Sequence, residues 1–120
     1  SHFFRWYSST INMFPVILAP IRAYDPKVQF SFFCFDPEKV YFNIGFYGYR
    51  CSNKPKGFYN RKIEIKAKEL GAQKMLYSTN FYTKNEFWKL YDRNTYIQLK
   101  KKYDRGNAFL DLYEKCVTGK

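Results

Sequence analysis

Apolar residues at helical spacing mark the middle of the chain. If residues 58–70 form a helix, the residues that share one of its faces are Tyr59, Ile63, Ala67 and Leu70. The segment "KIEIK" within this range also alternates as a strand does. We favour the helix, because Lys, Glu and Ala are good helix formers and Gly71 stands where a helix-terminating glycine belongs. Glu64 and Lys68 would then form an i,i+4 ion pair.

The clearest helix start lies in the C-terminal third. Thr83 and Glu86 have the spacing of a capping box, and Tyr82 and Phe87 have that of the accompanying hydrophobic staple. The sequence therefore predicts a helix that begins at Lys84. Apolar spacing predicts further helices at 3–10, at 95–103 and, after a cap at Asn107, at 108–117.

Runs rich in β-formers predict a small sheet. The runs are "MFPVILAPI" (13–21), "VQFSFFCF" (28–35), 39–47 and "QKMLYS" (73–78). Asp36 and Pro37 suit a type I turn, which predicts a hairpin between 28–35 and 39–47. Pro15 and Pro20 place the first run near a sheet edge. We therefore expect an α+β fold with a small antiparallel sheet of three or four strands, the helix at 58–70 on one face, and a helical C-terminal third.

Composition and charge limit the classes of function. The chain has 120 residues, of which 22% are aromatic, and a formal net charge of +11. That length allows one small domain with a modest core. The charge suits an anionic partner, although a lysine-rich solvated surface produces the same excess. We expect no transmembrane segment, because no run of about 20 mostly apolar residues is present.

The first residues indicate a piece of a longer protein. The chain has no initiator Met and opens on the aromatic segment "SHFFRWYSST". Polar residues and a proline interrupt the longest uncharged run, Trp6–Ile21, too often for a signal peptide. Such a piece should leave an apolar patch uncovered. We expect that patch at Phe3, Phe4, Trp6 and the C-terminal aromatic residues.

The sequence has little apparatus for catalysis by side chains. His2 is the only histidine, and no HExxH, CxxC or carboxylate cluster predicts a metal site. We expect Cys34, Cys51 and Cys116 to be buried, reduced thiols, with a Cys34–Cys51 disulfide as the open alternative. Chemistry in a protein of this kind would depend on a cofactor.

Several motifs, taken in order, resemble a known family. They are "FPVILAP", "VYFNIGFYG", "ELGAQKMLYSTNFYTKNEFWKLYD", "YIQLKKKYD" and "AFLDLYEKC". This succession is similar to the C-terminal part of FAD-linked oxidoreductases of the vanillyl-alcohol-oxidase type, and most similar to delta-24 sterol reductase-like proteins. The decaprenylphosphoryl-ribose oxidases share a weaker form of it.

The resemblance implies a division of the chain and a parent enzyme. Residues 1–80 would be the end of a substrate (cap) domain, and 81–120 a helical return segment. The FAD-binding domain would lie upstream in the same protein. The parent would be a FAD-dependent oxidoreductase that acts by hydride transfer on a sterol-like or other small apolar substrate, and this chain would be inactive alone. A cytoplasmic or membrane-associated location would suit it.

The resemblance assigns roles to three residues. Tyr77 and Asn80 match positions near the flavin, and Asn43 matches a position that faces the substrate. The oxidases have a Lys where this chain has Asn80, which favours the sterol-reductase-like form. Two simpler roles stay open: Asn43 as an ordinary outward strand residue, and Tyr77 as a core tyrosine whose hydroxyl is satisfied.

The rival hypothesis is a module that binds single-stranded nucleic acid. The aromatic hairpin 28–47 would stack bases, and "NRKIEIKAK" and "LKKKYDR" would contact phosphates. No RNP1-like pattern or GxxG loop accompanies them. A plain interaction domain with no bound ligand is the third class.

Overall fold

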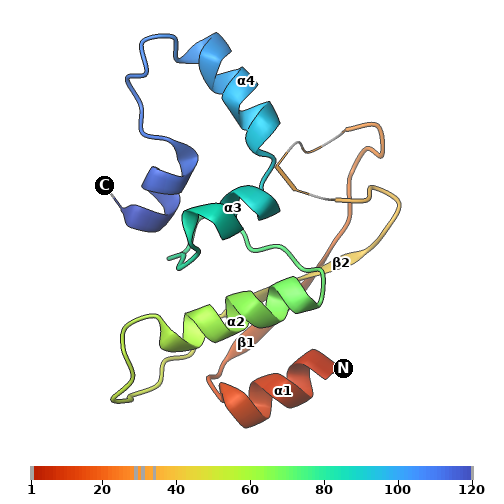
Figure 1. The fold of residues 1–120 in the computed structure, drawn as a ribbon. Helices are drawn as coiled ribbons and strands as arrows, with labels where there is room; N and C mark the ends of the chain where they lie inside the picture. Colours follow the sequence, from red (N-terminus) through yellow and green to blue (C-terminus); the bar gives the residue numbers. More distant parts are fainter. Residues whose placement is uncertain (1, 29, 31, 34, 120) are drawn as a thin grey trace. The chain divides into compact units, whose positions relative to one another are not determined.

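The computed structural model describes residues 2–28, 30, 32–33 and 35–119. In chain order its elements are α1 (His2–Thr10), β1 (Val16–Ile21), β2 (Tyr41–Phe46), α2 (Phe58–Glu69), α3 (Lys84–Leu90), α4 (Arg93–Tyr103) and the π-helical segment η1 (Glu114–Thr118) (Figure 1). The predicted α+β class, with an antiparallel sheet and a helical C-terminal third, is confirmed. The described sheet has two strands, however, and not the three or four that were expected.

The chain forms two compact units. The first comprises Ser1–Gln29 with Phe35–Lys56, and the second comprises Phe30–Cys34 with Gly57–Lys120. The predicted placement of the helix at 58–70 on one face of the sheet stays a prediction, because that helix and the sheet belong to different units.

The first unit is built on the β1–β2 pair and α1. β1 runs antiparallel to β2 with Val16 opposite Phe46 and Ile21 opposite Tyr41. Pro20 donates no backbone hydrogen bond, and each strand of a two-stranded ladder has one free edge on which a missing donor is tolerated. The buried ring of Tyr7 in α1 stacks on Phe46, with ring centroids 5.1 Å apart. The predicted helix at 3–10 and the strand within 13–21 are thus confirmed.

The predicted pairing of 39–47 with 28–35 in a hairpin is wrong. Lys39 does donate to the carbonyl of Asp36 at 3.1 Å, so the turn forms. The described residues among 28–35 form turns and coil, however, and β2 pairs with β1 instead. Residues 29, 31 and 34 of this run lie outside the described residues. The runs 13–21 and 28–35 are both β-rich, so the local sequence pattern cannot show which of them pairs with β2. The pairing observed, between β1 and β2, joins the run that is more distant in sequence.

After β2 the backbone folds back on the segment before β1. A Cβ on Gly48 would lie 2.5 Å from the backbone nitrogen of Phe14. Only glycine therefore fits this close approach without a shift of backbone.

The second unit begins with α2, as predicted, and the strand alternative is excluded. The helix ends in a Schellman motif: Ala72 donates to the Ala67 carbonyl at 2.8 Å, and Gly71 donates to Lys68 at 3.1 Å. Gly71 has φ 69°, a conformation that glycine adopts at little cost. The predicted strand at 73–78 is wrong, since these residues form coil and a turn.

The capping box and staple at the start of α3 are confirmed. Thr83 accepts from the Glu86 amide, and the Glu86 carboxylate accepts from the Thr83 amide at 2.9 Å. Tyr82 and Phe87 are both buried, and they form the centre of the second unit with Tyr91. Much of the aromatic density of this stretch is therefore core.

The last two helices differ from prediction at their starts. α4 begins at Arg93, two residues early, because Asp92 caps the Thr95 amide at 3.1 Å. The final helical segment begins at residue 112, and Asn107 is not its cap. Asp111 is the cap: it accepts from the Glu114 amide at 2.7 Å, and Glu114 accepts from the Asp111 amide at 2.9 Å. The ring of Tyr113 then packs on Phe87, so this segment returns beside α3 (Figure 1).

Exposure differs in part from expectation. Cys51 is exposed and Cys116 half-buried, so the expectation of buried thiols is wrong for Cys51, while Cys34 lies outside the described residues. Phe3, Phe4 and Trp6 are half-buried. At the other end of the chain Tyr103 and Phe109 are exposed. One contiguous patch that unites these groups stays a prediction.

Candidate functional site

The residues assigned from the sequence fall in both units. Asn43 lies in β2 of the first unit, half-buried and opposite Ala19. Tyr77 and Asn80 lie in the turn and coil between α2 and α3 of the second unit. The site is therefore described from the second unit, in which two of the three residues and a pocket occur together.

Tyr77 presents its side chain to solvent. It is 78% exposed, so the alternative role as a core tyrosine is excluded. Its hydroxyl forms no hydrogen bond with the rest of the described chain. A phenol held in this way keeps both its donor and its acceptor for a group outside the chain.

Asn80 points inward. It is 2% exposed, and its amide nitrogen donates to the carbonyls of Ser78 at 2.6 Å and Cys116 at 3.0 Å. These bonds tie the turn that presents Tyr77 to the C-terminal segment. The side-chain oxygen of Asn80 is buried without a hydrogen-bond partner in the described structure. Such an acceptor is costly to leave unpaired, so a donor from outside the described residues, such as a water molecule, is expected to reach it.

A cluster of charged side chains fixes the other side of the same segment. We call Glu64, Arg61, Lys74 and Glu86 the Glu64 cluster. The Glu64 side chain is 1% exposed and accepts from Lys74 at 2.9 Å, from Arg61 at 3.3 Å and from the Phe81 amide at 3.0 Å. Lys74 also donates to the Thr79 carbonyl at 2.6 Å. A buried charge needs such partners, because desolvation is otherwise expensive.

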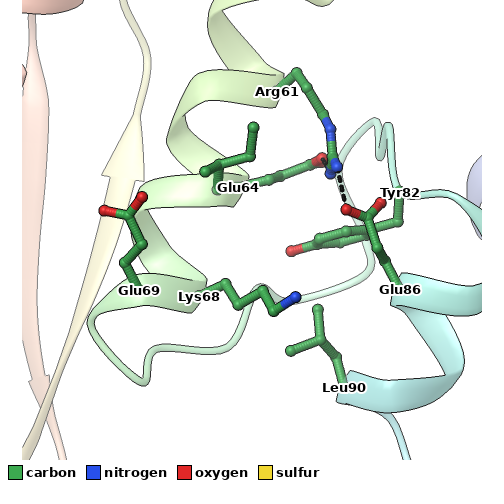
Figure 2. Close-up of a pocket in the computed structure, with 8 residues that line it drawn as sticks. Arg61, Glu64, Lys68, Glu69, Tyr82, Glu86 and Leu90 are labelled. Carbon is green, nitrogen blue, oxygen red and sulfur yellow. Dashed lines mark hydrogen bonds and ion pairs between the residues drawn. The ribbon is translucent and has the colours of Figure 1, made fainter.

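Arg61 extends the cluster to the next helix. Its guanidinium pairs with Glu86 on α3 as well as with Glu64 on α2 (Figure 2). Glu86 is held by the capping box at the same time. The backbone amide of Thr83 and then Arg61 lower the pKa of Glu86 to about 2, so this carboxylate is ionised throughout the neutral range.

A pocket of about 310 Å³ opens beside the cluster. Its lining is Arg61, Glu64, Ile65, Lys68, Glu69, Tyr82, Glu86 and Leu90. Figure 2 shows the Tyr82 ring lying between α2 and α3. Burial, and after it the charge of Glu64, raises the pKa of Tyr82 to about 12. Tyr82 therefore keeps its proton at neutral pH.

Sequence reasoning missed most of the Glu64 cluster. The predicted Glu64–Lys68 pair is wrong: Glu64 pairs with Arg61, one turn back, and with Lys74, which lies beyond the helix. The i,i+3 spacing of Arg61 and Glu64 is a signal that was available. Nothing in the local pattern brings Lys74 back to α2, because the returning coil was predicted as a strand.

The described chain shows neither a metal cluster nor a membrane span. Within its described ranges, no group of three or more His, Cys, Asp or Glu side chains could hold a metal ion. None of the helices in the part of the chain that the structure describes is long and apolar enough to cross a bilayer.

Comparison with known proteins finds two distant relatives. The chain is similar to the delta(24)-sterol reductases of Rattus norvegicus and Mus musculus, with 28% identity over 111 residues in each case. The similarity covers 91% of this chain and 21% of each relative, so the chain spans about a fifth of the length of the proteins it matches. No protein-family model matches it. No solved structure matches it either.

Proposed function

We propose that this chain is a C-terminal substrate-domain segment of a FAD-dependent oxidoreductase. The observation that carries the proposal is the similarity to delta(24)-sterol reductases along 91% of the chain. Because the chain spans about a fifth of these relatives, the FAD-binding domain is assigned to the remainder of the same protein. The substrate is a sterol-like or other apolar molecule, and the segment is inactive alone.

The two residues assigned to FAD fit it unequally. The exposed and unpaired hydroxyl of Tyr77 suits a hydrogen bond to a ring that arrives from another domain. Asn80 does not suit direct contact, because its amide hydrogens are used within the chain and its oxygen is buried. We therefore assign Tyr77 to the cofactor and Asn80 to positioning the turn that presents Tyr77.

The chain's own residues would shape the site rather than react. When bound, FAD supplies the hydride chemistry, which no side chain of this segment provides. Tyr77 donates a hydrogen bond and orients what it contacts. Asn80 and the Glu64 cluster hold the backbone around Tyr77 from two sides. Asn43, in the sheet of the first unit, is assigned to the apolar substrate through the resemblance alone.

The test uses the full-length protein that contains this chain. Its flavin content is read from the absorbance spectrum, and turnover is read by mass spectrometry as the gain or loss of two hydrogens by a sterol substrate, with an electron donor or acceptor supplied in the assay. Tyr77→Phe and Asn43→Ala should each lower turnover about 5- to 150-fold, the range expected when one placed hydrogen bond is lost. Tyr24→Phe is the matched control, because Tyr24 is fully exposed in the first unit.

The outcomes separate the proposal from its residue assignments. A full-length protein without flavin would overturn the proposal. Retained flavin with unchanged turnover in both variants would remove Tyr77 and Asn43 from the site. Asn80→Ala should lower the stability of the turn together with turnover, whereas Tyr77→Phe should lower turnover only.

The nucleic-acid alternative receives no support. It relied on a stacking platform made by a hairpin of 28–35 with 39–47, and that hairpin does not form among the described residues. The lysines of "NRKIEIKAK" lie on or beside α2, where Lys66 pairs with Glu69 at 2.5 Å.

A further inference from the structure

The second unit ends in an exposed basic segment. We call residues 98–110, the C-terminal half of α4 and the loop after it, the basic tip (Figure 1). Except for Lys100 and Asp104, every residue of the tip is exposed. The exposed residues include four large apolar side chains, and the two aromatic ones are more than 70% exposed. The four are Leu99, Tyr103, Phe109 and Leu110.

The charges of the tip are mostly unpaired. The segment contains four cations and one acid, which gives a net charge of +3. That acid, Asp104, is already used: it pairs with Lys100 at 2.5 Å and accepts from the amides of Ala108 and Phe109. The three other cations have no carboxylate partner in the described parts of the chain, and they are Lys101, Lys102 and Arg105.

Two contacts made by lysine side chains bring the apolar and cationic residues of the tip together. Lys100 donates to the carbonyl of Phe109 at 2.7 Å, so the loop that bears Phe109 lies against α4. Leu99 and Tyr103 are four residues apart and share one face of that helix. The ammonium of Lys102 lies 5.0 Å from the centre of the Tyr103 ring. Exposed rings and cations without a carboxylate partner among the described residues therefore occur together in the basic tip.

We propose that the basic tip docks on the surface of a bilayer that contains anionic phospholipid. Tyr103 and Phe109 would enter the headgroup region, where aromatic side chains are favoured, and the lysines would stay at the level of the phosphates. The tip requires no membrane-spanning helix to do so. This inference does not depend on the proposed oxidoreductase function.

Charge complementarity favours a bilayer over a protein partner. Lysine is depleted in protein interfaces, because a buried ammonium must be desolvated and matched by a placed carboxylate. Anionic headgroups are mobile, and they gather around a cation without a prearranged partner. Each Lys or Arg near such a surface strengthens binding about 5-fold. Apolar side chains among free cations are the pattern that interfacial segments use.

The experiment measures vesicle flotation of the 120-residue chain. Vesicles of pure phosphatidylcholine are compared with vesicles that contain about 30% phosphatidylserine, at low and at physiological salt. The chain should float with the anionic vesicles and not with the neutral ones. Lys101→Glu, Lys102→Glu and Arg105→Glu combined should weaken that binding at least about 100-fold.

Two matched controls separate the tip from overall charge and overall exposure. Lys27→Glu, Lys56→Glu and Lys89→Glu change the charge equally at exposed sites elsewhere, and most of the binding should remain. Tyr103→Ser with Phe109→Ser should weaken binding about 10-fold or more. Tyr24→Ser with Tyr49→Ser, which removes two other exposed rings, should have little effect. Circular dichroism checks that each variant is folded.

Three outcomes would overturn the proposal. The first is no flotation with anionic vesicles. The second is equal loss in the tip variant and the charge-matched control, which would mean that net charge alone drives binding. The third is tighter binding of the tip to a single-stranded RNA 20-mer or to an acidic polypeptide than to the vesicles, with the same loss in the tip variants.

Discussion

The Glu64 cluster and the basic tip use the same residue types in opposite ways. In the cluster, Lys74 and Arg61 are each within hydrogen-bond distance of a buried carboxylate. In the tip, Lys101 and Lys102 face solvent without a carboxylate partner in the described chain. The aromatic residues differ likewise: Phe87 has no exposed surface, whereas Phe109 is 74% exposed.

The difference lies in the return of the chain, not in composition. Residues 72–83 fold back over α2, so Lys74 reaches Glu64 and the Phe81 amide reaches the same carboxylate. The loop after α4 also returns to that helix, where Lys100 donates to the Phe109 carbonyl, but no carboxylate of the described residues reaches Lys101 or Lys102. A lysine is therefore structural where the backbone brings an acid to it, and it is left for an outside partner where no acid arrives.

The largest effect should come from the centre of the cluster. Glu64→Gln keeps the shape of the side chain and its acceptor for Phe81, but it removes the charge that Lys74 and Arg61 share. Breaking a buried ion pair by removal of one partner should destabilise the second unit by about 3 kcal/mol. Urea unfolding followed by Trp88 fluorescence, in a Trp6→Phe background, reports on this unit alone.

The matched control for this change is Glu69→Gln on the same helix. The Glu69 side chain is 53% exposed, and among the described residues it pairs only with Lys66, so its loss should cost less than about 1 kcal/mol. Equal losses in the two variants would show that burial of Glu64 contributes nothing, and the comparison of the two regions would then fail.

The predictions that proved correct concern structures formed by contacts between residues close in sequence. The capping box of Thr83 and Glu86, the glycine stop at Gly71 and the turn at Asp36 all involve residues within a few positions of one another. The predicted strand partner of β2 and the predicted strand at 73–78 were wrong, because strand formation depends on pairing with a segment that is distant in sequence. The sequence pattern contains the propensity to extend but not the partner.

The candidate site follows the same division. Tyr77 was singled out through a resemblance, and the structure adds that its hydroxyl is exposed. The inward bonds of Asn80 to Cys116, 36 residues away, could not be read from spacing. The second capping box, Asp111 with Glu114, was visible as a local pattern and was overlooked in favour of Asn107.

A smaller effect should come from Glu86, at the edge of the cluster. Its folded pKa, lowered to about 2, is below its unfolded value near 4.5. A carboxylate with a depressed folded pKa contributes stability above its unfolded pKa, and that stability is lost as the pH falls towards the folded pKa. Stability should therefore fall between about pH 4.5 and pH 2, partly because of this group.

Glu86→Gln isolates that contribution, because glutamine preserves the capping box without an ionisable group. The variant should lose about 1–2 kcal/mol at pH 7, and its stability should fall less steeply with acid than that of the wild type. The measurement is the urea midpoint at several pH values from 7 to 2.5. Parallel pH profiles for the two proteins would contradict the assigned role of Glu86.

The smallest effect on stability should come from substitutions in the basic tip, whose side chains have no buried partner to lose. Lys101→Ala and Tyr103→Ala remove exposed side chains from α4, where alanine has the better helix propensity. The higher helix propensity of alanine offsets the packing that is lost with the Tyr103 ring. The free energy of unfolding of each variant should therefore lie within about 0.5 kcal/mol of the wild-type value. The same urea titration with Trp88 as the reporter measures this. A loss above about 1 kcal/mol in either variant would mean that the side chains of the tip stabilise the folded unit. They would then not be available in full for contact with a membrane surface.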